Sequence, residues 1–493
     1  MEDFKFYLDK IGEVGFVEEV VHSIVYVSGI PQSHPTEVVV FESGDIGQVM
    51  SISKDQVEVL LLSKTQVRVG AQVARTGRLL QVEVGKNVLG RIIDPLGRPH
   101  DGGGVAKKAG PGESELRAID IKPQNMLNRQ PVVEPFETGV SIVDLVVPLG
   151  KGQRELVIGD RKTGKTEFLL QTIMTQAARG TICIYAAIAQ KNLDIKRLFG
   201  YFNDSGIKDQ TVIVASKSED PSGLIFLTPY TAMTIAEFFR DKGMDVLVIL
   251  DDMSGHARYY REISLLARRF PGRSAYPGDI FYVHARLIER AGNFKKGSIT
   301  CLPLAESIMG DLSGYIQTNL MAMTDGHIYF DIELYNQGKR PSVSPFLSVT
   351  RVGHQTQTPL EKDISRELSS FLVNYERMKT FLHFGTEVSE SVRRTLDLGK
   401  KLDLFFNQPA QIIIPINVNI LLIGALWAGL WNEIKAEDMK LEMINIANYY
   451  KSNQNYKGQI DTKVKGFANF SQLIDYLRQD DSLVQMVRTA TKR

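Results

Sequence analysis

One eight-residue motif, residues 159–166, limits what this chain can fold into more than any other feature. It reads Gly159-Asp160-Arg161-Lys162-Thr163-Gly164-Lys165-Thr166, a complete G-x-x-x-x-G-K-T. The motif follows an apolar strand-like run, residues 155–158, and opens a helical pattern over residues 165–179. Glycines let the backbone N–H groups of such a loop point at phosphate oxygens, and the helix N-terminus adds partial positive charge. The motif therefore predicts a phosphate-binding loop between a strand and a helix.

Two side chains of the motif, and one further along the chain, are candidates for the chemistry. A lysine at the place of Lys165 reaches the β- and γ-phosphates, and a hydroxyl at the place of Thr166 binds Mg²⁺. The apolar strand at residues 246–250 ends in a pair of aspartates, and its first member, Asp251, is the candidate for holding the metal ion or its water. The expected ligand is a nucleoside triphosphate or diphosphate with Mg²⁺.

The strand after the P-loop helix ends in Gln190, which bears on hydrolysis. Hydrolysis needs a group that positions the attacking water, commonly a carboxylate or a glutamine. A glutamine can orient water but cannot accept its proton as a glutamate does. Gln190 is therefore either an ordinary strand-end residue or a mark of a slow site, and the sequence leaves both open.

The chain has three regions with different patterns. With 493 residues it predicts about three domains. Short Val- and Ile-rich runs predict a small β-barrel or sandwich, alternating apolar strands and helices predict a parallel α/β sheet, and helical periodicity then predicts a bundle. The runs of the barrel are residues 16–27, 37–41, 49–52, 57–62 and 66–73. The strands and helices of the α/β region include residues 155–158, 181–189, 211–215, 231–241 and 246–250. The helices of the bundle include residues 362–384, 387–406, 436–452 and 470–478. We expect domains at residues 1–86, 87–357 and 358–493.

Charge and cysteine content limit the classes of function. The chain has 58 Lys and Arg against 57 Asp and Glu, a net charge of +1, which argues against a protein that coats nucleic acid. Its two cysteines, Cys183 and Cys301, lie in separate apolar runs and are expected to be reduced, as in a cytosolic protein. The N-terminus has no apolar core of signal-peptide length, so export is not expected.

A long segment without charge lies near the C-terminus. No Asp, Glu, Lys or Arg occurs between Asp403 and Glu433, and residues 420–431 are apolar throughout. Prolines and amides interrupt the first half of the segment, so a buried or partner-facing helix is favoured over a membrane span. Trp427 and Trp431, the only tryptophans, are four residues apart and are expected on one helix face, where core packing is favoured over an interface.

Three stretches of the sequence resemble the α subunit of F1-type ATPases. They are residues 153–166, the segment from Tyr259 through residues 272–282, and residues 348–353. The resemblance implies an N-terminal β-barrel, a central RecA-like P-loop domain with a parallel sheet and a C-terminal helical bundle. The catalytic β subunit of that family would carry a glutamate at the position of Gln190, so this chain resembles the α type.

The resemblance implies a site that binds Mg-ATP without turning it over. Lys165, Thr166 and Asp251 would hold the nucleotide. Arg340-Pro341 falls where the family lines its adenine pocket, and Gln408 lies near the family's base-contacting glutamines, although the spacing of residues 407–411 differs from the usual one.

A further implied role falls on Arg351, which is similar in position to the arginine finger of the family. A guanidinium brought to a neighbouring subunit stabilises charge on the transferring phosphate. Arg351 would thus act on the ATP of a β-like subunit. The alternative is that Arg351 is an ordinary surface arginine after a strand, without a catalytic role.

The resemblance also implies partners and a location. The chain would form an alternating ring with catalytic β-like subunits around a γ-like central stalk, without nucleic acid, peripheral to the cytoplasmic side of the cell membrane. The apolar segment from Ile420 to Trp431 suggests an additional partner.

Several residues depart from the family pattern. Ser344 stands where Asp, Asn or His is usual, Thr350 replaces a serine, residues 354–358 replace small residues, and the stator-anchoring N-terminal helix is reduced to about residues 3–11. These departures suggest an F1-like ATPase such as the duplicated complexes of mycoplasmas, one form of which drives gliding, and so a dedicated cytoplasmic motor as the alternative. A second alternative is a self-sufficient hexameric RecA-like translocase. It would need a glutamate in place of Gln190 and, for RNA, a basic or aromatic surface in residues 15–84.

Overall fold

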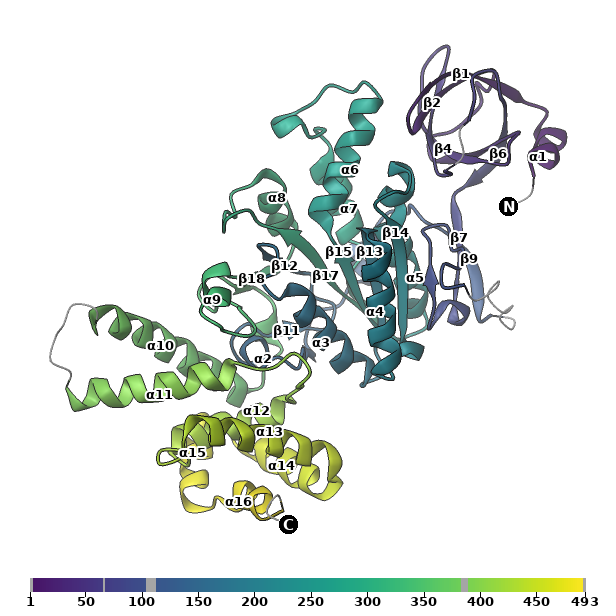
Figure 1. The fold of residues 1–493 in the computed structure, drawn as a ribbon. Coiled ribbons are helices and arrows are strands. Elements are labelled where there is room, and N and C mark those ends of the chain that lie inside the picture. The colour runs from purple at the N-terminus through teal and green to yellow at the C-terminus, as the bar shows by residue number, and fades with distance from the viewer. Residues whose placement is uncertain (1–2, 65–66, 103–111, 383–388, 491–493) are drawn as a thin grey trace. The chain divides into compact units, whose positions relative to one another are not determined.

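The computed structural model of the chain describes residues 3–64, 67–102, 112–382 and 389–490 (Figure 1). The chain divides into two compact units. The first comprises Met1–Gln130, Ala177–Glu306 and Leu312–Thr324, and the second comprises Pro131–Gln176, Ser307–Asp311 and Asp325–Arg493. The layout along the chain is the expected one: a six-stranded barrel, then parallel strands with helices, then helices alone.

The N-terminal region of the first unit is a closed barrel with the strand order β1-β2-β5-β4-β3-β6. Strands β1 and β4 alternate buried and more exposed residues, whereas β3 and β5 are buried throughout, and Val17, Val39 and Val59 meet in the core. The short helix α1 (Phe4–Ile11) packs Tyr7 against the outside of the barrel. The strands are β1 (Val14–Val21), β2 (Ile24–Ser28), β3 (Glu37–Phe41), β4 (Ile46–Ile52), β5 (Val57–Leu61) and β6 (Gln72–Leu79).

Two strand predictions in the barrel were wrong in detail. The run at residues 16–27 is two strands, because His22 adopts a positive φ of 53° in a tight turn between β1 and β2. The last strand begins at Gln72 instead of residue 66, since Gly70, with a φ of 85°, turns the chain just before it.

The rest of the first unit is built on parallel strands in the order β17-β15-β13-β14-β8. These strands are buried along nearly their whole length, as expected for a sheet covered by helices, and α5 packs against β13, β14, β15 and β17. Cys183 and Cys301 lie buried in β13 and β17. The elements are β8 (Ile92–Ile93), β13 (Ile182–Gln190), β14 (Thr211–Lys217), β15 (Asp245–Asp251), β17 (Ser298–Glu306), α4 (Asn192–Asp204), α5 (Ser222–Asp241), α6 (Met253–Leu266), α7 (Ile280–Ile288) and α8 (Tyr315–Met323), with β7 (Gln81–Gly85) paired to β9 (Ser114–Ala118) and β16 (Gly292–Asn293) paired to β17.

In the second unit, the motif follows one of three neighbouring strands. β12 (Glu155–Gly159) runs parallel to β18 (Gly326–Phe330), and β19 (Val349–Thr350) pairs antiparallel with β18. Helix α3 (Lys165–Ala177) follows the motif. Smaller elements are α2 (Ser141–Val146), α9 (Ile332–Asn336) and the pair β10 (Pro135–Phe136) and β11 (Leu149–Gly150).

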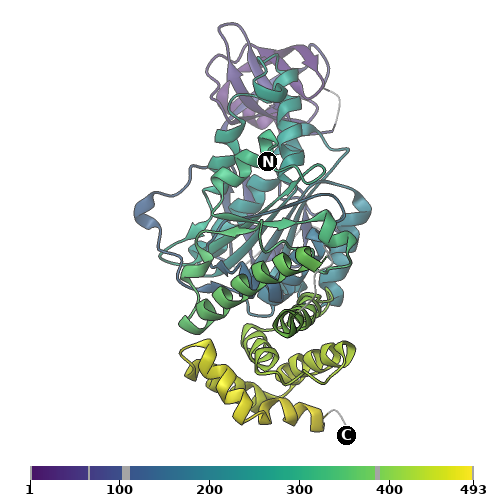
Figure 2. The same ribbon diagram turned by 90° about the vertical axis from the view of Figure 1, so that its left-hand side faces the viewer.

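The C-terminal part of the second unit contains helices and, among the described residues beyond Thr358, no strand. Figures 1 and 2 show these helices, green to yellow, packed on one another. The prediction of a helical bundle is confirmed, although helices α14 and α16 were not predicted. The helices are α10 (Pro359–Leu382), α11 (Glu390–Phe406), α12 (Ile416–Ala428), α13 (Ala436–Ser452), α14 (Gln454–Gly466), α15 (Phe470–Gln479) and α16 (Ser482–Ala490).

The charge-free segment forms α12, which the chain itself buries. Its residues 418–426 are all buried, against α13, α14 and α15 among others. The expected partner surface from Ile420 to Trp431 is therefore wrong for most of its length, because this apolar face is already covered. No helix among the described residues is long and apolar enough to span a bilayer.

The two tryptophans do not share a helix face, which corrects the sequence prediction. Gly429, with a φ of 86°, ends α12 between them. Trp427 packs edge-on against Phe371, whereas Trp431 lies beyond the helix, 1% exposed, with its indole N–H donating to Glu442. The prediction of core packing is therefore confirmed for Trp431, whereas Trp427 is partly buried between Phe371 and Phe470.

The burial of α12 can be tested by replacing Leu422, which is fully buried, with alanine. Leu422→Ala should lower the free energy of unfolding by about 2–5 kcal/mol, since it opens a cavity. Denaturant unfolding followed by tryptophan fluorescence reports on this region, because Trp427 lies in α12 and Trp431 follows it closely.

The matched control is Leu441→Ala on α13, where the leucine is 59% exposed. It should change the unfolding free energy by no more than ~0.5 kcal/mol. Equal effects of the two substitutions would contradict the burial of α12.

Candidate nucleotide-binding site

The motif forms a loop between β12 and α3, as the sequence predicted. A Cβ at Gly159 would lie 2.4 Å from the carbonyl oxygen of Phe330, so only glycine fits at the end of β12. Lys162 and Gly164 have φ values of 62° and 92°, which turn the loop back toward the helix. Arg161, Lys162 and Thr166 are exposed on it. The local sequence thus produces a tight loop at a helix N-terminus, the geometry that favours an anion.

The lysine of the motif is held over the loop. Lys165 is 7% exposed, and its ammonium donates to the carbonyl oxygens of Gly159 at 2.8 Å and Asp160 at 2.5 Å. The Thr163 hydroxyl also donates to the Asp160 carbonyl, at 2.7 Å. These contacts place a positive charge beside the loop backbone.

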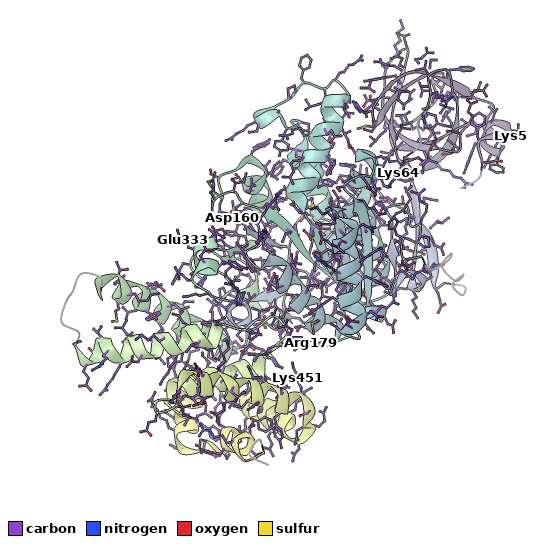
Figure 3. The ribbon with its side chains drawn as sticks, in the orientation of Figure 1. Lys5, Lys64, Asp160, Arg179, Glu333 and Lys451 are labelled. Atoms are coloured by element: carbon purple, nitrogen blue, oxygen red, sulfur yellow. The ribbon has the colours of Figure 1, made fainter. Side chains whose placement is uncertain are left out.

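Contacts from distant parts of the sequence fix the loop at both ends. At its start, Asp160, labelled in Figure 3, accepts a hydrogen bond from the Ser307 hydroxyl at 2.6 Å. At its far side, the fully buried Ser342 hydroxyl donates to the Thr163 carbonyl at 2.7 Å. The sequence analysis missed both serines, because nothing local marks a side chain that acts 147 or 179 residues away.

Arg340-Pro341, expected at the adenine side, follows α9 in the same unit as the loop. The Arg340 guanidinium carbon lies 3.6 Å from the centre of the Tyr335 ring, and its Nη1 donates to the carbonyl oxygens of Tyr335 and Lys339, both at 2.8 Å. The arginine is thereby stacked on an aromatic plane. Tyr335 was not predicted, but its spacing of five residues before Arg340 was a signal available in the sequence.

Gln408 lies next to this segment, yet its side chain is buried and committed to protein groups. Its backbone N–H donates to the Arg340 carbonyl at 2.6 Å. Its amide donates to the carbonyl oxygens of Gly139 and Ile412, and accepts from the N–H of Ser141 at 2.9 Å and the hydroxyl of that serine. In this structure Gln408 therefore ties the segment after α11 to Arg340, and a direct contact with a base remains a prediction.

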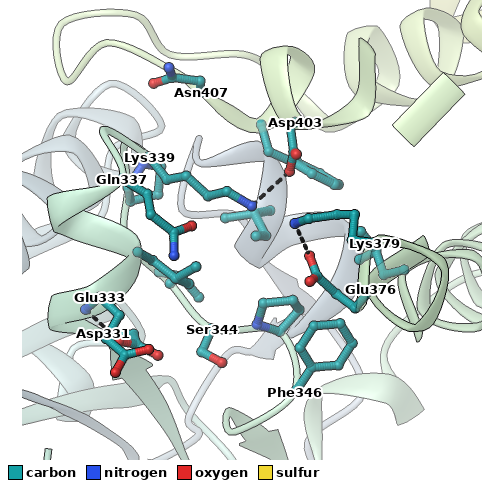
Figure 4. Close-up of a pocket in the computed structure, with 17 residues that line it drawn as sticks. Asp331, Glu333, Gln337, Lys339, Ser344, Phe346, Glu376, Lys379, Asp403 and Asn407 are labelled. Atoms are coloured by element: carbon teal, nitrogen blue, oxygen red, sulfur yellow. Dashed lines mark hydrogen bonds and ion pairs between the residues drawn. The ribbon is translucent and has the colours of Figure 1, made fainter. Parts of the chain in front are cut away.

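A cavity of about 390 Å³ lies beside Pro341, between the loop after α9 and the helices α10 and α11 (Figure 4). The Lys339 ammonium reaches across it to Asp403 at 2.8 Å, and Lys379 pairs with Glu376 at 2.8 Å. Ser344 also lines it. The Lys339–Asp403 ion pair ties the Arg340 segment to α11, as the Gln408 backbone does.

Gln190 and Asp251 belong to the first unit, at the ends of the neighbouring parallel strands β13 and β15. Asp251 is 8% exposed and accepts a hydrogen bond from the Tyr185 hydroxyl at 2.5 Å. Burial, followed by the charges of Asp251 and Glu306, raises the pKa of Asp252 to about 7. Tyr185 and Asp252 were not predicted, although Asp252 follows Asp251 directly in the sequence.

Arg351 lies just after β19, on a turn whose backbone is fixed. Its N–H donates to the carbonyl of Asp325 at 3.1 Å. The Thr350 hydroxyl donates to the Pro148 carbonyl at 2.9 Å and accepts from the N–H of Gly353 at 3.1 Å. A Cβ at Gly353 would lie 1.6 Å from the Pro148 oxygen, so the turn has no room for another residue there. The Arg351 side chain is exposed.

These features define a class of protein. A P-loop between a strand and a helix, parallel strands that end in Gln190 and Asp251, an N-terminal barrel and a C-terminal helical region together make the chain a P-loop nucleotide-binding protein of the α/β class.

Comparisons with known proteins identify the family. The family model described as "ATP synthase alpha/beta family, nucleotide-binding domain" matches residues 139–350, and the one described as "ATP synthase alpha/beta chain, C terminal domain" matches residues 357–475. The chain belongs to the ATP synthase alpha/beta family.

Curated relatives place it with the α type within that family. It is 39% identical over 447 residues to the ATP synthase subunit alpha of Dictyoglomus turgidum, covering 90% of this chain and 87% of that protein. The subunit alpha of Neorickettsia sennetsu is 38% identical over 462 residues, covering 91% and 89%, and that of Lactobacillus johnsonii is 37% identical over 456 residues, covering 91% and 90%. The resemblance to an F1 α-type, nucleotide-binding subunit is confirmed.

The contact between Ser342 and the loop gives a test of the site. Ser342→Ala leaves the buried Thr163 carbonyl without its donor, a loss of about 1–3 kcal/mol. We expect ADP to bind the full chain about tenfold more weakly, which corresponds to ~1.4 kcal/mol, as measured by titration calorimetry.

Ser471→Ala, on the exposed surface of α15, is the matched control and should leave the ADP affinity unchanged. If Ser342→Ala bound ADP as tightly as the unmodified chain, the loop would not depend on this anchor.

Proposed function

We propose that this chain is the non-catalytic α-type subunit of an F1-type rotary ATPase. It binds Mg-ATP or Mg-ADP through the loop of residues 159–166 and supplies Arg351 to the catalytic site of a neighbouring β-like subunit. The ring of alternating α-like and β-like subunits surrounds a γ-like central stalk and is peripheral to the cytoplasmic side of the cell membrane. The similarity to proteins named ATP synthase subunit alpha supports this reading.

The presentation of Arg351 is the observation that carries the proposal. The backbone on either side of it is pinned by the Thr350 hydroxyl and the Asp325 carbonyl, whereas its exposed guanidinium has no hydrogen bond or ion pair within the described residues. A fixed base with an unpaired guanidinium is what a residue needs if it acts on a charge in another molecule. Arginine suits this role because it stays charged and offers a planar set of donors.

The nucleotide that the chain itself binds would not turn over. Lys165 would contact its phosphates, and Arg340 with Tyr335 forms an arginine–aromatic pair suited to an adenine ring. Gln190 can orient a water but cannot take its proton. Hydrolysis by this site therefore lacks a general base among the residues proposed for it.

Each of the two residues predicted to bind magnesium carries an oxygen donor. Mg²⁺ prefers oxygen ligands and is commonly bound through one or two protein groups together with phosphates. The exposed Thr166 hydroxyl on the first turn of α3 and the Asp251 carboxylate are donors of this kind. The ion would neutralise phosphate charge, and the Tyr185 hydroxyl would keep the Asp251 carboxylate oriented.

The first test uses the full chain alone. It should bind Mg-ATP, and the bound ATP should remain intact over a period in which a catalytic site would complete many turnovers. The control Lys165→Ala should abolish binding. Sustained ATP hydrolysis by the purified chain would contradict the α-type assignment and favour a self-sufficient translocase.

The second test uses the complex assembled with its catalytic partner. Arg351→Ala should lower kcat for ATP hydrolysis by ~10³-fold or more, the range of arginine fingers that act in trans. The matched control is Arg394→Ala on α11, whose guanidinium is exposed and pairs with Glu390. That control should leave kcat unchanged, and a similar kcat for both variants would overturn the role of Arg351.

A further inference from the structure

Two carboxyl groups lie near Arg351 inside its own subunit, and neither pairs with it. The Asp325 carboxylate is occupied by Arg154, which donates to it from Nη2 at 2.7 Å, from Nε at 3.1 Å and from its backbone N–H at 2.9 Å. The other carboxyl group is that of Glu155, on β12, which is fully buried. The state of Glu155 therefore decides whether Arg351 has a competing negative charge nearby.

Glu155 on β12 pairs with Gly326 on β18, the strand next to the one that ends just before Arg351. A Cβ at Gly326 would lie 2.7 and 2.8 Å from the two Glu155 carboxyl oxygens, and Gly326 is the residue that pairs with Thr350 between β18 and β19. The carboxyl group thus packs closely against Gly326 and leaves no room for a side chain at that position.

One glutamine joins this carboxyl group to the turn of Arg351. Gln153 is fully buried, and its amide nitrogen donates to Glu155 Oε2 at 2.7 Å and to the Thr350 hydroxyl at 3.2 Å. Its amide oxygen accepts from the N–H of Gly150 at 2.8 Å. Both amide protons are used, so the glutamine can satisfy only one carboxyl oxygen.

The remaining oxygen, Glu155 Oε1, is buried without a hydrogen-bond partner in the described part of the chain. An ionised carboxylate in this position would be costly, because it accepts a single hydrogen bond and is removed from water. Burial, together with the charge of Asp325, raises the pKa of Glu155 well above its usual value, although the Gln153 hydrogen bond and the charge of Arg351 act in the opposite direction. Both lines of reasoning favour the protonated, neutral acid.

We propose that Glu155 is a positioning residue for Arg351 and that it acts as a neutral acid. Through Gln153 it holds the Thr350 turn from which the arginine extends, and because it is uncharged it leaves the guanidinium available to the neighbouring subunit. This inference rests on the role proposed for Arg351, and it adds a residue two strands away that does not touch the nucleotide of the neighbouring site.

The test compares a neutral mimic with an apolar replacement in the assembled complex. Glu155→Gln preserves the shape and the acceptor for Gln153, so kcat should stay within about threefold of the unmodified complex. Glu155→Leu removes the acceptor, and kcat should fall by ~10–100-fold while KM stays within twofold, as expected when a catalytic group is misplaced by about 1 Å.

A second variant separates positioning from a folding defect. Gln153→Leu breaks the same connection without changing the acid and should give the same loss of kcat at unchanged KM. ADP binding by the full chain, which depends on the P-loop after β12, should be retained by these variants if the loss is one of positioning. Loss of ADP binding together with kcat would show a local folding defect and overturn the inference.

Combination with Arg351→Ala distinguishes the two proposals. Gln153→Leu should lower kcat no further in the Arg351→Ala background, because its effect acts through the arginine. If Arg351→Ala itself leaves kcat unchanged, the proposed function fails. If Arg351→Ala lowers kcat but Gln153→Leu and Glu155→Leu do not, or if Glu155→Gln loses as much activity as Glu155→Leu, only the role of Glu155 fails.

Discussion

The contact between the Thr350 hydroxyl and the Pro148 carbonyl fixes the turn on which the proposed function depends. The hydroxyl has one proton and two lone pairs, and all three are used, toward Pro148, Gly353 and Gln153. Gly353 approaches the same carbonyl so closely that no side chain fits at this position of the turn. The backbone of an exposed arginine on such a turn is already ordered, so little backbone entropy is lost when the arginine binds a charge in another molecule.

The nucleotide loop and the arginine turn belong to one compact unit and share β12 as a common base. The loop continues from the end of this strand at Gly159, while Gln153 and Glu155, just before and at its start, reach the arginine turn. A substitution at the start of β12 is therefore able to affect both the nucleotide loop and the turn that carries Arg351. This arrangement makes separate measurements of ADP binding and of catalysis by the neighbour necessary, since either one alone would leave the cause of a defect open.

Local patterns predicted much of the fold and part of the site. The P-loop was predictable because its glycines and lysine are contiguous, and the order of the regions was predictable because strand and helix periodicity are local properties. The end of α12 was missed because a single residue, Gly429, outweighed the apolar run around it. The predicted barrel strand at residues 16–27 failed for a similar reason, a turn at His22 within a run of β-forming residues.

The contacts that support the site were not predictable in the same way. Ser342 and Gln153 act on Thr163 and Thr350, which lie far from them in the sequence, and no local pattern marks these two contacts. Gln408 is an example. The resemblance implied that it lies near a base, whereas in the structure its amide forms hydrogen bonds with a carbonyl oxygen and an N–H of its own chain.

The most direct measurement of the central claim is the trapping of a transition-state analogue in the assembled complex. Mg-ADP with fluoroaluminate mimics the phosphate in transfer, and its release from the β-like subunits can be followed with labelled ADP. The account predicts stable trapping by the complex with the unmodified chain and rapid release with Arg351→Ala, while the nucleotide on the chain's own loop exchanges equally in both. Equal retention of the analogue by both complexes would contradict the claim that Arg351 acts in trans.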